Sequence, residues 1–127
     1  MAKYVYNKWE PVAETVDELY FHELHNGSGK LKILLKKFGQ DEVTLVILFD
    51  GTLTYRVAQE AARMLTINDN APMPLFSVST NSEFLDWFKE DSGGMFNDWS
   101  LMHISICNTD NIIDVITNQY PQVEWIK

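Results

Sequence analysis

The segment from Glu42 to Asp50, with the sequence EVTLVILFD, constrains the fold most strongly. In an extended chain, alternate side chains point to opposite faces. One face of this segment carries Val43, Leu45, Ile47 and Phe49, and the other carries Val46 and Leu48. A strand with two apolar faces is typically buried on both sides. We therefore expect a central strand of a sheet, covered on each face by neighbouring segments.

Two further strands are indicated before this segment. Leu19 to His25 alternates imperfectly, and Lys30 to Lys37 alternates clearly between lysines and aliphatic residues. The intervening sequence Asn26-Gly27-Ser28-Gly29 favours a tight turn, because Asn and Gly tolerate the positive φ of hairpin turns. These features predict an antiparallel meander that ends in the Glu42–Asp50 strand.

The second half of the chain mixes helical and extended patterns. Arg56 to Leu65 has the apolar spacing of a helix, following a short exit from the sheet. Thr80 and Glu83 have the spacing of a capping box, and the helix that they open is expected to end at Ser92-Gly93-Gly94. Short strands are expected at Leu75–Val78, Leu101–Cys107 and Val123–Ile126, an edge strand or surface arm at Met1–Pro11, and either helix or strand at Ile112–Tyr120.

The composition and length are those of one packed domain. The chain has 127 residues, of which 46% are hydrophobic and 13% aromatic. We expect a single domain over residues 1–127. Its predicted class is α+β, with a largely antiparallel sheet of five or six strands packed with two or three helices.

The charge of the chain limits its partners. Eighteen acidic residues against ten basic ones give a formal net charge of −8. Such a chain is repelled by nucleic acid and by anionic lipid, and it attracts basic proteins. The single cysteine, Cys107, permits no internal disulfide, and no segment has the pattern of a signal peptide or a membrane span. We expect a cytoplasmic protein that needs no cofactor and binds neither nucleic acid nor a membrane, while its oligomeric state stays open.

Two sequence patterns that suggest catalysis or metal binding are incomplete. ILFDGTLT at 47–54 resembles the first motif of haloacid dehalogenase-type phosphatases, but Leu48 occupies the position of the nucleophilic aspartate. Asp50-Gly51-Thr52 is therefore interpreted as a turn. His22 and His25 are three residues apart, which places them on opposite faces of a strand, so we expect no metal site there.

A group around His103 stays open to two interpretations. His103 lies on the face of its strand opposite Ile104, as a partly buried, hydrogen-bonded residue or as part of a site. Arg56 and Glu60 have the i, i+4 spacing of a helical ion pair, and Tyr55 is adjacent to them. A small enzyme would use His103 with Asp50, Tyr55 or Glu60.

The stretch from Glu83 to Trp99 gives the strongest indication of function. It combines carboxylates with large aromatic side chains around the Gly93-Gly94 pair, and it contains five acidic residues and only one lysine. Aromatic side chains anchor protein interfaces, and carboxylates attract Lys and Arg of a partner. The predicted partner-binding residues are Glu83, Asp86, Trp87, Glu90, Asp91, Asp98 and Trp99.

Several sequence elements together resemble a family of small, acidic, single-domain bacterial proteins that includes immunity proteins of toxin–immunity systems. The matching elements are Tyr55-Arg56 with Glu60, Phe76 before Ser82-x-Phe84-x-x-Trp87-Phe88-x-x-Asp91-Ser92, His103-Ile104-Ser105-Ile106, Asp114-Val115-Ile116, and Pro121-x-Val123-Glu124. They extend over most of 49–125. The resemblance implies a compact α+β domain and supplies no catalytic residue.

From this resemblance and the acidity we expect a non-enzymatic inhibitor that occludes a basic, nuclease-like toxin domain. The alternatives are a protein-interaction or regulatory domain with another partner, and a small ligand-binding protein or enzyme around His103.

Overall fold

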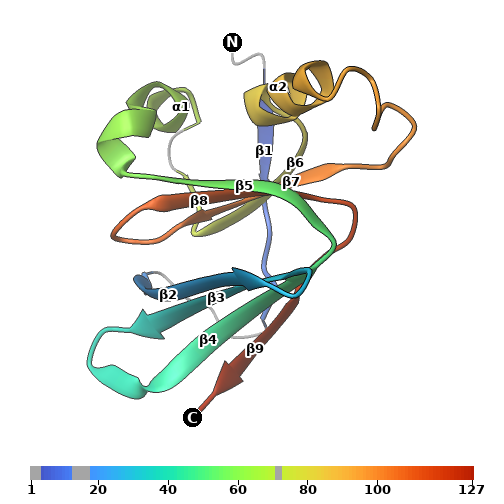
Figure 1. Cartoon of the computed structure of the whole chain (residues 1–127). Coiled ribbons are helices and arrows are strands. Elements are labelled where there is room, and N and C mark those ends of the chain that lie inside the picture. Colours follow the sequence, from blue (N-terminus) through green and yellow to red (C-terminus); the bar gives the residue numbers. More distant parts are fainter. Residues whose placement is uncertain (1–3, 13–17, 71–72) are drawn as a thin grey trace.

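The chain forms two antiparallel sheets stacked face to face, with its helices on the outer side of one sheet (Figure 1). The computed structural model describes residues 4–12, 18–70 and 73–127. The helix-covered sheet has the order β1-β6-β7-β8-β5, and the second sheet, called the open sheet below, has the order β2-β3-β4-β9. No helix among the described residues combines the length and the apolarity that crossing a membrane requires.

The elements have the following bounds. The helix-covered sheet contains β1 (Val5–Lys8), β5 (Thr52–Ala58), β6 (Phe76–Asn81), β7 (Met102–Cys107) and β8 (Ile112–Thr117). The open sheet contains β2 (Tyr20–Gly27), β3 (Lys30–Lys37), β4 (Gln40–Asp50) and β9 (Gln122–Ile126). The helical elements are the 3₁₀ turn η1 (Glu60–Arg63) and the helices α1 (Met64–Asp69) and α2 (Glu83–Asp91).

The expected meander is confirmed. β2 pairs with β3 and β3 with β4, both antiparallel, and Ile33 lies opposite Ile47. The β2–β3 turn places Ser28 at φ 54° and Gly29 at φ 75°, the left-handed conformation that tight hairpins need. The strand expected within Met1–Pro11 is β1 at the sheet edge, although residues 1–3 lie outside the described ranges.

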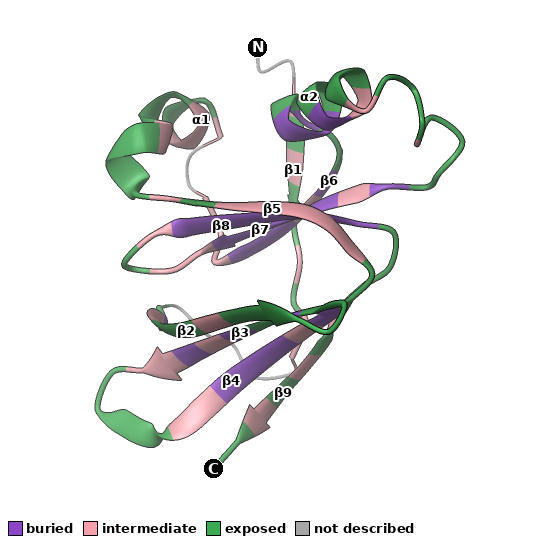
Figure 2. Ribbon diagram, viewed as in Figure 1, coloured by how far each residue is buried: buried purple, intermediate pink, exposed green. Residues whose placement is uncertain are grey.

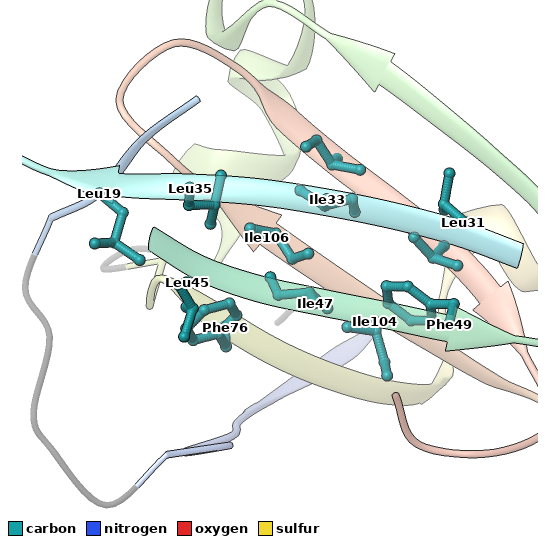
Figure 3. Close-up of a cluster of buried hydrophobic side chains, with 12 residues drawn as sticks. Leu19, Leu31, Ile33, Leu35, Leu45, Ile47, Phe49, Phe76, Ile104 and Ile106 are labelled. Carbon is teal, nitrogen blue, oxygen red and sulfur yellow. The ribbon is translucent and has the colours of Figure 1, made fainter. Parts of the chain in front are cut away.

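The hydrophobic core lies between the two sheets. Figure 3 shows the inward side chains of β3 and β4 facing those of β7, with Phe76 from β6 beside them. Ile33, Ile47, Ile104 and Ile106 are all fully buried. Their alternation with outward residues therefore follows the period of two that the sequence predicted for these strands.

Burial on both faces belongs to β8 rather than to β4. All six residues of β8 are buried, because the open sheet covers one face and the helical layer contributes to covering the other (Figure 2). The inner face of β4 is buried, but Leu48 on its outer face is only half-buried. As expected, β4 is an interior strand of its sheet, but its outer face is covered only in part. Val46 on that face is buried at 8% exposure, Leu48 is not, and none of the described helices packs on the open sheet (Figure 1).

The α+β class is confirmed only in its coarse form. Among the described residues, nine strands form two sheets with two short α-helices, so the predicted single sheet of five or six strands is wrong. The two layers of a sandwich replace the single helix-packed sheet that we expected.

Two local predictions are also wrong. Residues 56–58 continue β5 instead of starting a helix, because pairing with β8 holds Arg56 opposite Asp114. The capping residue of α2 is Ser82 instead of Thr80, because β6 extends to Asn81, which pairs with Val5 of β1. In both cases strand pairing with a distant segment outweighs a local helical pattern.

The Asp50-Gly51-Thr52 sequence is a turn, as predicted, and it carries the chain from the open sheet to the helix-covered sheet. Gly51 has φ 97°, a conformation that side chains rarely adopt. The backbone carbonyl of Asp50 accepts a hydrogen bond from Gln119 Nε2, in the β8–β9 connection. The β4–β5 and β8–β9 passages between the layers therefore lie side by side.

Replacement of Ile47 by Ala tests the position of the core. Ile47 is fully buried, whereas Ile126 on β9 is 44% exposed and serves as a matched control. We expect I47A to lower the free energy of unfolding by about 2–5 kcal/mol, because it loses apolar burial and leaves a cavity. I126A should cost less than about 1 kcal/mol. Urea unfolding of both variants measures the difference, and equal losses would contradict the assigned faces.

Candidate functional site

The seven predicted partner-binding residues are all exposed and lie on α2 and the segment that follows it. We call them the acidic–aromatic surface: Glu83, Asp86, Trp87, Glu90, Asp91, Asp98 and Trp99. The first five belong to α2, and the last two belong to a run of turns over residues 92–100. All seven residues are therefore accessible to solvent in the described structure, and their role in binding stays a prediction.

The helix that carries this surface is fixed by its opposite face. Phe84, Leu85 and Phe88 are buried and pack with Leu101 and Ile116 against the helix-covered sheet. Apolar residues at i, i+1 and i+4 form one stripe of the helix, which leaves the acidic positions facing solvent. The packing of α2 thus determines which side chains are presented.

The two tryptophan side chains are exposed, but aromatic contacts restrain both of them. Trp87 is 49% exposed and stacks on Phe84, with ring centroids 5.6 Å apart and planes 9° from parallel. Trp99 is 46% exposed and meets Phe96 edge to face at 4.9 Å. Phe96 in turn contacts the buried Phe88 ring at 5.2 Å. Each tryptophan is therefore held by an aromatic contact that leads into the protein.

The carboxylates around the tryptophans are largely unpaired. Asp86 accepts a hydrogen bond from the Tyr4 hydroxyl at 3.0 Å. Among the ion pairs between described residues, none includes Glu83, Glu90, Asp91 or Asp98. Unpaired carboxylates beside half-exposed aromatic rings leave both kinds of contact available to another molecule.

A second cluster of polar residues lies buried beneath the helical layer and was not predicted as a unit. Asp114 on β8 is fully buried at the centre of this cluster. Its Oδ1 lies 2.6 Å from His103 Nε2, and its Oδ2 accepts a hydrogen bond from Arg56 Nε at 3.1 Å. Arg63 of η1 donates a further hydrogen bond to Oδ2. One carboxylate thus joins β5, β7, β8 and η1.

The other ring nitrogen of His103 connects this cluster to α2. His103 Nδ1 lies 2.7 Å from the hydroxyl oxygen of Ser82, which also accepts a hydrogen bond from the backbone N–H of Leu85 at 3.2 Å. A carboxylate only accepts, so Nε2–H of His103 donates to Asp114. Nδ1 accepts the Ser82 proton when the imidazole is neutral and donates to the Ser82 oxygen when it is charged, so this contact is satisfied in either state.

The electrostatics of Asp114 depend on its cationic neighbours. Burial by itself raises the pKa of this carboxyl group, because it disfavours the charged form. The hydrogen bond from His103 and the charges of His103, Arg63 and Arg56 outweigh that effect and hold the pKa well below the ordinary aspartate value. The carboxylate is therefore charged at neutral pH although it is buried.

The buried cluster also contacts the acidic–aromatic surface. The Arg56 guanidinium carbon lies 4.2 Å from the centre of the Phe84 ring, which also stacks with Trp87. Phe84 meets His103 edge to face at 5.3 Å. The charge pair at Asp114 therefore helps to fix the start of α2 and the ring on which Trp87 stacks.

The succession Ser82–His103–Asp114 has the residue types of a catalytic triad but not an open geometry. Ser82 and His103 are fully buried, and the hydroxyl of Ser82 caps α2. A substrate carbonyl reaches this oxygen only if α2 leaves the sheet. The arrangement is that of a closed structural network.

Of the other candidate residues, Arg56 joins the His103 cluster through Asp114, whereas Tyr55 and Asp50 lie elsewhere. Tyr55 packs against the core between the sheets, on the face of the sheet opposite His103. Arg56 pairs with Asp114 instead of Glu60, and Asp50 is exposed at the passage between the sheets. His22 and His25 are exposed beside Glu23, and the described residues contain no group of three or more metal-ligating side chains.

One sequence signal indicated the buried cluster. Asp114 is the single acid in the apolar run Ile112-Ile113-Asp114-Val115-Ile116, and a charge within a buried strand requires a partner. Arg63 gave no comparable signal, because its contact depends on how η1 folds back over the sheet.

Comparisons of the chain with protein-family models, with curated proteins and with solved structures found no match.

Replacement of Asp114 by Asn tests the buried cluster. The variant keeps the shape of the side chain but leaves two guanidinium groups without a buried counter-charge. We expect a loss of about 3–5 kcal/mol in the free energy of unfolding, as for other broken buried ion pairs. The exposed, unpaired Asp98 provides the control, since D98N should change stability by less than about 0.5 kcal/mol. Similar effects of both variants in urea unfolding would contradict the network.

The depressed pKa of Asp114 also predicts a pH dependence. The stability that this carboxylate contributes is fully present above its ordinary pKa of 3.8 and is lost as the pH falls toward the lower pKa of the folded protein. The stability difference between the native sequence and D114N should therefore shrink below about pH 4. Urea unfolding at a series of acidic pH values measures this, and a constant difference would exclude Asp114 as the titrating group.

Proposed function

We propose that this protein is a non-enzymatic, immunity-type inhibitor that binds a basic toxin domain through its acidic–aromatic surface. The observation that carries the proposal is the exposure of Trp87 and Trp99 among carboxylates without ion-pair partners in the described structure. This combination occurs at protein interfaces, where tryptophan is enriched among the residues that contribute most to affinity.

The tryptophans supply the anchoring part of the interaction. Each ring leaves nearly half of its area in water, and burial of this area against a partner stabilises a complex. Because stacking on Phe84 and contact with Phe96 restrain the two rings, less conformational entropy is lost on binding. The two rings are therefore preorganised, and a partner can bind this surface without a change of fold.

The carboxylates supply attraction and selectivity. The net charge of −8 and the local excess of acidic residues accelerate encounters with a basic protein. Nuclease domains carry basic clefts because their substrate is a polyanion. An acidic surface that enters such a cleft excludes the nucleic acid by charge and by volume, and this mechanism requires no cofactor.

A protein-interaction domain with a basic partner other than a toxin would use the same surface. The two functions differ in the activity of the partner, so the identity of the captured protein distinguishes them. Inhibition of a nuclease by the purified protein supports the immunity function.

Reversal of two charges on α2 tests the surface. Glu90 and Asp91 are exposed at the end of the helix, away from its buried stripe. We expect the double variant E90K/D91K to weaken binding of the basic partner more than about tenfold at low salt, with a smaller effect at high salt, where charges are screened. Tagged protein captures the partner from a lysate of the source cells, and calorimetry with the purified partner measures the affinity.

The control makes the same charge change on the open sheet. Glu42 and Glu124 are exposed on β4 and β9, so E42K/E124K alters the net charge equally at a different place. This variant should keep most of the affinity. Equal loss in both variants would mean that only net charge matters, and no loss in E90K/D91K would remove α2 from the interface.

A further inference from the structure

A cavity lies on the outer face of the helix-covered sheet, beside η1 and α1 and apart from the acidic–aromatic surface. Its floor is a row of three side chains across neighbouring strands. Cys107 donates its backbone N–H to the carbonyl of Leu75 at 2.8 Å, and it pairs with Ile112 of β8. The side chains of Leu75, Cys107 and Ile112 line the bottom of the cavity. Strand register therefore places three apolar side chains together in a lining that also includes the polar residues Asn108 and Thr109.

The walls come from segments that leave the sheet. After β5 ends at Ala58, η1 and α1 bring Glu60 and Ile67 over the row. Glu18 lines the cavity beside Thr109, whose N–H donates to the carbonyl of Leu19 at 2.9 Å. The cavity is open to solvent on one side, and its volume of about 420 Å³ is within the range that small ligands occupy. The cavity is therefore built by backbone pairing on two sides.

The charge of the lining is negative. Glu18 and Glu60 are exposed, and neither has an ion-pair partner in the described parts of the chain. Arg63, the cation of η1, is occupied by Asp114. Burial raises the pKa of Cys107 to about 11, so the thiol adds no charge at neutral pH. The site thus combines an apolar floor with two carboxylates that have no counter-charge.

We propose that this cavity binds a small aliphatic ammonium ion. The alkyl chain of such a ligand packs on Leu75, Cys107 and Ile112, and its ammonium group lies between Glu18 and Glu60. Anionic ligands are repelled by both carboxylates, and a bare cation gains nothing from the apolar floor. A free alkylamine and the side chain of a lysine share this chemistry.

Titration of the full chain with hexylammonium tests the proposal. In ¹H–¹⁵N NMR spectra we expect saturable shifts of the Cys107, Thr109 and Ile112 amides, while the amides of α2 stay in place. Cys107 is the only cysteine, so its modification by methyl methanethiosulfonate reports on the same cavity. Hexylammonium should slow this modification. Absence of both effects at millimolar ligand would overturn the proposal.

Matched ligands separate charge from apolar contact. Hexanoate has the same chain length with the opposite charge and should not shift these amides. Equal binding of hexanoate would overturn the assignment of an ammonium site. N-acetyl-lysine amide presents the lysine side chain, and tighter binding of this compound than of hexylammonium would identify a peptide lysine as the occupant, whereas the reverse would identify a free amine.

Matched variants test the two carboxylates. The double variant E18Q/E60Q should keep the fold, because both side chains are exposed, and should weaken hexylammonium binding about fivefold. The control E42Q/D98N removes two exposed charges elsewhere and should leave the affinity unchanged. Unaltered affinity in E18Q/E60Q, or an equal loss in the control, would overturn the roles of Glu18 and Glu60.

Discussion

The buried carboxylate of Asp114 is the constraint on which the arrangement of the helix-covered sheet depends. A charge removed from water is costly unless hydrogen bonds and counter-charges replace its hydration. Here His103, Arg56 and Arg63 provide them from β7, β5 and η1, and Ser82 extends the network to α2. Apolar layers tolerate small displacements, whereas directional hydrogen bonds do not. The helical layer is therefore held in one position by polar geometry.

This arrangement separates the parts of the molecule that provide stability from those available for binding. The core between the sheets stabilises the fold by burying apolar side chains, and this contribution does not depend on which residues are exposed at the surface. The helical layer carries the buried charge network on its inner side and exposed carboxylates and tryptophans on its outer side. Ser82 caps α2 and also contacts His103. This residue therefore connects the helix that carries the exposed surface with the buried network that stabilises the fold. The surface proposed to bind a partner is thereby coupled to the buried polar network around Asp114.

Local sequence patterns predicted the parts of the fold that local physics determines. The alternation in Lys30–Lys37 and the glycine-rich turn before it gave the meander, and the acids and tryptophans of 83–99 gave the exposed surface. Arg56 was misassigned to a helix because its strand partner, β8, is remote in the sequence. Ile112–Tyr120 stayed ambiguous since a strand buried on both faces lacks alternation. The cluster around Asp114 required contacts that only the assembled sheets create.

The pairing of β5 with β8 has a consequence for how the chain reaches this structure. Arg56 and Asp114, which are in contact, are 58 residues apart in the sequence. β4 likewise pairs with β9, which follows it at a long distance along the chain. Contacts so distant in sequence require large loop closures before any stabilisation is gained, so folding is expected on the slow, millisecond-to-second scale of sandwich proteins. During synthesis, β4 emerges long before β9 and β5 long before β8, so each strand has an unpaired edge that other chains can pair with. Pairing with β8 and β9 covers these edges, and the net charge of −8 opposes association between chains before that pairing is made.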